Sequence, residues 1–195
     1  IKGYDSQYKA GIYAFSASMD FETIADILVG GKVNMVSFTV PEGPTLEQTI
    51  DKLVSQGMGS KDIFEKEVKD KKWFDKYEFL RYSSYEDEMR KSLSDNYLEG
   101  YLMPNTYYVA EGASEEDVID VMLNQFNKDV FEGIFKEFLN DKNSRLSQKY
   151  GAYLITECGF QLRDVIKYAS IIERETVLDE ERPLVSAVIY NRLEK

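Results

Sequence analysis

The segment Tyr168–Thr176 reads Tyr-Ala-Ser-Ile-Ile-Glu-Arg-Glu-Thr, a pattern typical of an apolar helix that ends on two glutamates. A carboxyl group beside apolar side chains can have a raised pKa, and a carboxyl still protonated near neutral pH can act as a general acid. At about 100° per residue, Glu173 and Glu175 lie about 200° apart around the helix, so only one can face a given cleft. Such a pair is poorly placed to flank one sugar. The spacing therefore favours a mechanism with a single carboxylate and leaves both glutamates as candidates.

The composition excludes several other kinds of chemistry. The 195 residues include no histidine and one cysteine, Cys158. Ser-His-Asp and Cys-His catalysis are therefore absent, as is the commonest zinc ligand, and we predict neither a metal nor a cofactor. The formal net charge of -11 disfavours contact with phosphate backbones, so nucleic acid is not an expected partner.

The first 57 residues contain an internal repeat, in which residues 15–29 align with residues 40–54. Each copy begins with an alternating extended run, turns, and continues into a helix with Asp20 or Thr45 as its N-cap. The repeat predicts two strand-helix units and hence a small α+β module.

The remainder of the chain is predicted to be mainly helical. Residues 58–94 form an expected helical connector. Its aromatic cluster between Trp73 and Leu80 is expected to fill a core or a domain junction rather than to form a stacking platform for a ligand. Ser114 caps a long helix farther along the chain.

Two further helices are expected at residues 162–176 and 184–193. In the first of them, Val165, Ala169 and Ile172 make the expected core-facing stripe.

A turn-rich extended segment at residues 98–109 separates the helices and is punctuated by glycine and proline. It concentrates side chains that can form hydrogen bonds with a polyol, among them Glu99, Asn105 and Tyr107. The chain has 14 tyrosines, whose flat apolar faces and hydroxyl groups suit polar clefts such as those that bind sugars.

Two motifs near the end of the chain resemble a known family. Ala169–Thr176 (Ala-Ser-Ile-Ile-Glu-Arg-Glu-Thr) followed by Glu181–Leu193 (Glu-Arg-Pro-Leu-Val-Ser-Ala-Val-Ile-Tyr-Asn-Arg-Leu) is similar to the signature of the MltG (YceG-like) endolytic murein transglycosylases. Glu99–Tyr107 resembles that family's Glu-Gly-aromatic-(Leu or Phe)-Phe-Pro-Asp-Thr-Tyr segment. Met103 stands there for the usual Phe, and Asn105 for the usual Asp.

The start of the chain carries the same resemblance more weakly. Lys9–Tyr13 (Lys-Ala-Gly-Ile-Tyr) and Val40–Gly43 (Val-Pro-Glu-Gly) look like the family's LysM-like region. The resemblance implies an α+β fold with a LysM-like module at residues 1–57, a connector at 58–94, and a mainly α-helical, lysozyme-like catalytic domain at 95–195. That last domain is expected to be incomplete at its C-terminus.

The resemblance implies that Glu175 is the general acid/base. It would protonate the glycosidic oxygen between N-acetylmuramic acid and N-acetylglucosamine, and then help the muramic C6 hydroxyl close a 1,6-anhydro ring. Glu99, Asn105, Tyr107 and Asn191 are the expected substrate contacts. We therefore expect Glu175 to be partly buried in a groove near Tyr107 or Asn191, with Glu173 pointing elsewhere.

The implied partners are the glycan strands of nascent peptidoglycan, and cell-wall synthases. The parent protein is expected to be a single-pass membrane protein, anchored by an N-terminal helix that precedes Ile1, and to act on the extracytoplasmic face of a bacterial membrane. A cleft segment is expected after Lys195, and without it the chain should be weakly active or inactive. The alternative is a non-catalytic peptidoglycan-binding or scaffold module in which Glu175 is structural.

Overall fold

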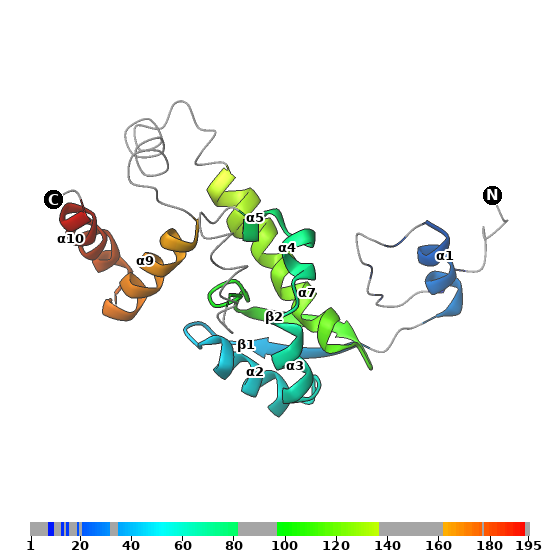
Figure 1. Ribbon diagram of the computed structural model, residues 1–195. Helices are drawn as coiled ribbons and strands as arrows, with labels where there is room; N and C mark the ends of the chain where they lie inside the picture. Colours follow the sequence, from blue (N-terminus) through cyan, green and yellow to red (C-terminus); the bar gives the residue numbers. More distant parts are fainter. Residues whose placement is uncertain are drawn as a thin grey trace.

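The computed structural model describes residues 8–9, 13, 15, 19, 21–31, 35–81, 97–136, 162–176 and 178–193. These residues are mostly helical with one two-stranded sheet, which confirms the α+β class (Figure 1). The elements in chain order are α1 (Phe21–Gly30), β1 (Met35–Val40), α2 (Leu46–Ser55), α3 (Lys61–Glu67), α4 (Lys72–Lys76), α5 (Glu78–Arg81), β2 (Asn105–Ala110), α7 (Glu115–Phe126), the π-helical η1 (Asn127–Phe135), α9 (Leu162–Glu175), the 3-10 turn η4 (Asp179–Glu181) and α10 (Arg182–Leu193). Figure 1 shows α1 to one side of a central body and the α9–α10 pair to the other.

The sheet joins two segments that lie far apart in the sequence. β1 and β2 are antiparallel, with Met35 opposite Ala110 and Val40 opposite Asn105. On the buried face, Phe38 lies opposite Tyr107, and their rings stack with centroids 5.2 Å apart. This pairing fixes the segment that carries two of the expected substrate contacts against the strand that leads into α2.

The second copy of the predicted repeat is confirmed as β1 followed by α2. A capping box begins α2, because the Thr45 hydroxyl accepts from the backbone N–H of Gln48 while the Gln48 side chain accepts from the backbone N–H of Thr45. The helix of the first copy is also present as α1, whereas most of the extended run before it lies outside the described residues. β1 pairs with β2 from beyond the repeat, so a LysM-like arrangement of the two copies remains a prediction.

One hydrophobic core holds the central body together. The predicted aromatic cluster is buried, with Trp73 and Phe79 each 0% exposed. The Phe79 ring contacts four other rings, and these belong to Tyr77, Tyr101, Phe126 and Phe131. The same core contains side chains from α2, from α3 to α5, from residues 97–110 and from α7. Described residues on both sides of each predicted domain boundary, at residues 57 and 94, pack together in this core. The division of the chain into three domains at these residues stays a prediction from the sequence.

The α9 helix contacts this core through a different face from the one predicted. Leu162 is 1% exposed and Ile166 packs against the core, whereas Val165 is 37% exposed and Ala169 is exposed. The predicted stripe through Val165 and Ala169 is therefore wrong as a core face. The close approach depends on Gly100, whose φ is 84° and where an added Cβ would lie 2.7 Å from Cγ2 of Ile166.

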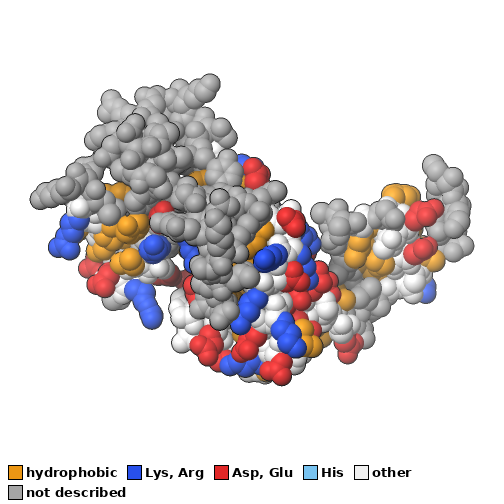
Figure 2. Space-filling model, in the orientation of Figure 1, with side chains coloured by type: hydrophobic (Ala, Val, Ile, Leu, Met, Phe, Trp, Pro, Cys, Tyr) orange, Lys and Arg blue, Asp and Glu red, His pale blue; other side chains and the backbone are white. Residues whose placement is uncertain are grey.

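The surface carries mixed charges over the central body and exposed hydrophobic side chains over the α9–α10 pair (Figure 2). Among the latter, Leu178, Leu184 and Val188 are 57%, 70% and 52% exposed. None of the helices in the described ranges is both long enough and apolar enough to cross a membrane.

Four buried tyrosines should make the folded state sensitive to alkali. Burial raises the pKa of Tyr101 to about 12, and it raises the pKa values of Tyr77, Tyr97 and Tyr107 well above the ordinary value of 10.0. The folded state therefore binds these protons more tightly than the unfolded chain. Its stabilisation is complete below pH 10.0 and is lost as the pH rises above that value toward the folded pKa values.

We expect the free energy of unfolding to fall above about pH 10, by about 1.4 kcal/mol per pH unit for each such tyrosine. Urea unfolding measured at a series of pH values checks this. Tyr101→Phe keeps the ring and removes one titrating group, so its loss of stability should be less steep than that of the unaltered protein. Equal slopes for the two proteins would contradict the assignment to Tyr101.

Candidate functional site

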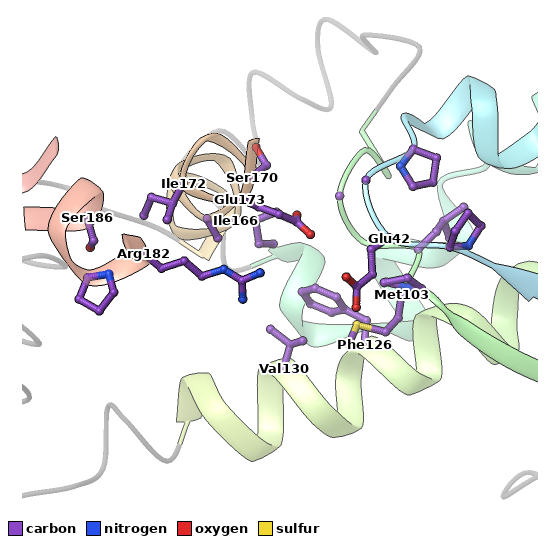
Figure 3. A pocket seen from close by; sticks show the side chains of 18 residues that line it. Glu42, Met103, Phe126, Val130, Ile166, Ser170, Ile172, Glu173, Arg182 and Ser186 are labelled. Atoms are coloured by element: carbon purple, nitrogen blue, oxygen red, sulfur yellow. The ribbon is translucent and has the colours of Figure 1, made fainter. Parts of the chain in front are cut away.

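A groove runs between the α9–α10 pair and the central body (Figure 3). Its volume is about 720 Å³. Three segments supply its walls: the turn between β1 and α2, the turn that precedes β2 together with one face of α7 and η1, and the facing sides of α9 and α10. The lining side chains are mainly apolar and include Leu102, Met103, Phe126, Val130, Ile166 and Ile172.

The orientation of α9 decides which of its glutamates faces the groove. Ile166, Ala169, Ser170, Ile172 and Glu173 line the groove from this helix. At about 100° per residue, Glu173 lies within about 20° of the buried Leu162 around the helix axis. The anchoring of α9 through the Leu162 face therefore turns Glu173 toward the groove.

Glu175 is exposed and is not among the groove-lining residues. It lies about 220° around the helix from Leu162, which places it away from the core-facing side. The expectation that Glu175 is partly buried in a groove while Glu173 points elsewhere is therefore wrong for the groove described here. The physical reason is that α9 packs through Leu162 and Ile166 rather than through the predicted stripe.

Three charged side chains line the groove, namely Glu42, Glu173 and Arg182. Figure 3 shows all three directed toward the same space, above Phe126 and Val130. Arg182 also forms an ion pair with Asp179 through Nη2, at 3.1 Å, and the Asp179 side chain is 86% exposed. Within the described part of the chain, the carboxylates of Glu42 and Glu173 have neither an ion pair nor a hydrogen bond.

Glu99 links two walls of the groove. The backbone N–H of Leu46 donates to both carboxylate oxygens of Glu99, at 3.1 and 3.0 Å. This places a negative charge at the N-terminus of α2, where the helix dipole favours it. Glu99 therefore holds the turn that contains Gly100 against the start of α2, and its carboxylate is engaged within the protein.

Tyr107 is also engaged within the fold. It is 4% exposed, and its hydroxyl donates to the carbonyl oxygen of Met103 at 2.5 Å. This bond fixes the Met103–Pro104 turn that lines the groove. Asn105 is exposed at the start of β2, where its Oδ1 accepts from the backbone N–H of Thr106 at 2.7 Å.

Asn191 lies near the end of α10 and is exposed. The groove-lining residues of α10 are at its other end, in the first turns, where Pro183 and Ser186 lie. The structure thus brings none of Glu99, Asn105, Tyr107 and Asn191 to the lining of this groove. Within the described ranges, no group of three or more histidine, cysteine, aspartate or glutamate side chains is placed to hold a metal ion.

Sequence reasoning did not select Glu42 or Arg182 as site residues. The signals were present, since Glu42 lies in a Pro-Glu-Gly-Pro turn directly after a strand and Arg182 precedes the proline that opens the last helix. Neither signal indicates which way a side chain points. That depends on how α9 and α10 pack against the body.

The fold and the groove define an α+β domain with an open, mainly apolar groove that carries three charged side chains. The YceG-like family matches the chain over residues 1–195, and the chain belongs to this family.

Relatives and a solved structure support this membership. An endolytic murein transglycosylase of Streptococcus pneumoniae strain R6 is 28% identical over 200 residues, covering 96% of this chain and 33% of the relative. An endolytic murein transglycosylase of Bacillus subtilis strain 168 is 26% identical over 192 residues, covering 97% of this chain and 48% of the relative. A crystal structure of a YceG-like protein from Listeria monocytogenes aligns with a TM-score of 0.60 at 25% identity, covering 96% of this chain and 57% of that one. The chain thus spans about a third to a half of the length of these curated relatives.

Proposed function

We propose that this chain is part of an endolytic lytic transglycosylase that cleaves the bond between N-acetylmuramic acid and N-acetylglucosamine in peptidoglycan. The observation that carries the proposal is its membership of the YceG-like family, in which relatives over nearly its whole length are named endolytic murein transglycosylases. The open groove beside α9 supports it, because an extended glycan strand needs an accessible surface with polar and apolar faces.

In the proposed mechanism, Glu175 is the general acid/base. Its carboxyl protonates the glycosidic oxygen as the bond from that oxygen to the muramic C1 breaks. The resulting carboxylate then takes the proton of the muramic C6 hydroxyl while that oxygen bonds to C1 and closes the 1,6-anhydro ring. The proton that Glu175 gives in the first step returns in the second, so no water is consumed and no second carboxylate is required.

The choice of Glu175 rests on its place in the Glu-Arg-Glu-Thr motif. Two features of the described residues are compatible with it. The carboxylate has no hydrogen bond or ion pair with any of them, and the side chain is exposed, so a glycan can reach it. The Thr176 hydroxyl donates to the carbonyl oxygen of Ile172 at 2.7 Å, which secures the last turn that carries Glu175.

We further propose that the protein acts on the extracytoplasmic side of a bacterial membrane, where its polymeric substrate is found, and that it meets cell-wall synthases there. Glu99 and Tyr107 would contribute by holding the turns beside the groove, since their polar atoms are already hydrogen-bonded within the fold. Asn105 and Asn191 are exposed and remain proposed substrate contacts.

The nature of the product ends tests the proposal. Purified murein is incubated with the native protein, and the released fragments are analysed by mass spectrometry. We expect 1,6-anhydro-muramic ends, which are lighter than hydrolytic ends by the mass of one water. Reducing muramic ends would instead indicate a hydrolase.

Non-catalytic murein binding is the second candidate, and the position of Glu175 outside the described groove favours it. Co-sedimentation of the protein with insoluble murein, with no soluble fragments released, would support this alternative over catalysis.

A further inference from the structure

We propose that the groove beside α9 binds the peptide stem of peptidoglycan, with Arg182 on a stem carboxylate and with Glu42 and Glu173 on the stem's ammonium group. This inference rests on the proposed function, because it takes murein as the substrate. In this proposal the groove is a specificity site that distinguishes stem-bearing from stem-free glycan.

The charges that line the groove suggest this occupant. Neutral sugar hydroxyls require no charged partner, yet Glu42, Glu173 and Arg182 all point into one space (Figure 3). A murein stem carries carboxylates and, at its diamino acid, an ammonium group. A groove with both signs of charge therefore complements a zwitterionic peptide better than it complements a bare glycan.

Arg182 can bind a carboxylate without giving up its existing partner. Its ion pair with Asp179 uses Nη2, and the guanidinium group has further donors on its other edges. The Asp179 side chain is 86% exposed, so this pair is weak and easily exchanged. A planar guanidinium over an apolar floor is suited to bidentate recognition of a carboxylate.

Glu42 is held on a rigid support. It lies in a turn between Pro41 and Pro44, whose rings restrict the backbone, and Gly43 adopts a φ of 84°. Its carboxylate is therefore presented to the groove with little loss of chain entropy on binding. The apolar floor at Met103 and Phe126 offers packing for the small methyl side chains of the stem's alanines.

Binding measurements on soluble muropeptides test this without relying on cleavage. The probes are a disaccharide-tetrapeptide, the same compound with its stem amine acetylated, and the stem-free disaccharide, each titrated calorimetrically into the native protein. We expect the stem-bearing compound to bind about tenfold more tightly than the stem-free one, as for one or two hydrogen bonds between charged groups.

Substitutions assign the contacts. Arg182→Gln should weaken binding of the stem-bearing compound about tenfold and leave the stem-free disaccharide within about twofold. The affinity of Arg182→Lys for the stem-bearing compound should fall between those of the unaltered protein and Arg182→Gln, because lysine keeps the charge and loses the bidentate geometry. Glu42→Gln should reduce the difference in affinity between the free and the acetylated amine, because Glu173 still faces the ammonium group. Arg192→Gln and Glu47→Gln are the matched controls, since both side chains are exposed outside the groove lining and should bind all three compounds as the unaltered protein does.

Equal affinity of the unaltered protein for the stem-bearing and stem-free compounds, or no measurable binding of either, overturns the inference. An equal loss for both compounds in Arg182→Gln overturns it as well, because that result places Arg182 on the sugar or in the fold. The stem inference can fail while the product ends still identify a transglycosylase, so failure of the inference and failure of the proposed function are distinguishable.

Discussion

Replacing Glu175 with Gln should lower the rate of murein cleavage by the native protein by about 10²–10⁴-fold, the range that a general acid/base contributes. Glutamine keeps the size and the hydrogen-bonding oxygen of the side chain but can neither donate the acid proton nor recover it. The loss should appear in kcat, measured as the rate at which anhydro ends are released, and stem binding should be unchanged.

Glu173→Gln is the matched comparison, because the two glutamates share one helix and differ in the direction they face. Glu173 lines the groove, so its substitution should raise KM for stem-bearing murein and change kcat by less than about threefold. Glu180→Gln, an exposed carboxylate in η4, serves as the control for charge alone. A larger loss of kcat in Glu173→Gln than in Glu175→Gln would identify the groove-facing carboxylate as the acid.

Phe79→Ala should destabilise the folded protein by about 3–5 kcal/mol, the usual cost of removing a large buried ring and leaving a cavity. Phe79 is 0% exposed, and its ring contacts the rings of Tyr101 and Phe126, with centroid distances of 5.5 and 4.9 Å. It therefore connects α5 with the turn before β2 and with α7. Urea unfolding followed by tyrosine and tryptophan fluorescence measures the change.

Phe21→Ala is the control for this substitution, because Phe21 is 70% exposed on α1 and its truncation should cost no more than about 0.5 kcal/mol.

The shape of the urea unfolding transition also tests the predicted domain boundary at residue 94. A shared core predicts one cooperative transition that shifts as a whole in Phe79→Ala. Two transitions, of which only one shifts, would mean that the segments before and after the boundary unfold separately.

Local patterns predicted the helices and strands well because each depends on near neighbours in the chain. Thr45 and Ser114 both cap helices through capping boxes, as residues of their type at those positions should. The aromatic cluster around Trp73 is buried, because large apolar side chains so close together in a sequence are most often part of a hydrophobic core. The partner of β1 was not predictable in the same way, since β2 lies far along the chain and pairing depends on long-range packing.

The candidate site was only partly predictable. Motifs drew attention to the glutamates of α9 and to the segment Glu99–Tyr107, and that segment does form a wall of the groove. Its polar side chains are predicted substrate contacts, and in the structure Glu99 and Tyr107 form hydrogen bonds with backbone groups of the fold. Backbone N–H and carbonyl groups in the interior need partners, and a sequence pattern does not reveal which side chains will supply them.

The sequence by itself determined that this chain has an α+β fold, that it belongs to the YceG-like family, and that none of its 195 residues is a histidine. It also placed two glutamates on opposite sides of one helix end, a spacing that favours a mechanism with a single carboxylate. The tertiary structure decided which of the two faces the described groove. Packing of Leu162 and Ile166 against the core, with Gly100 allowing close approach, sets the rotation of α9, and that rotation turns the exposed Glu173 toward the groove and Glu175 away from it.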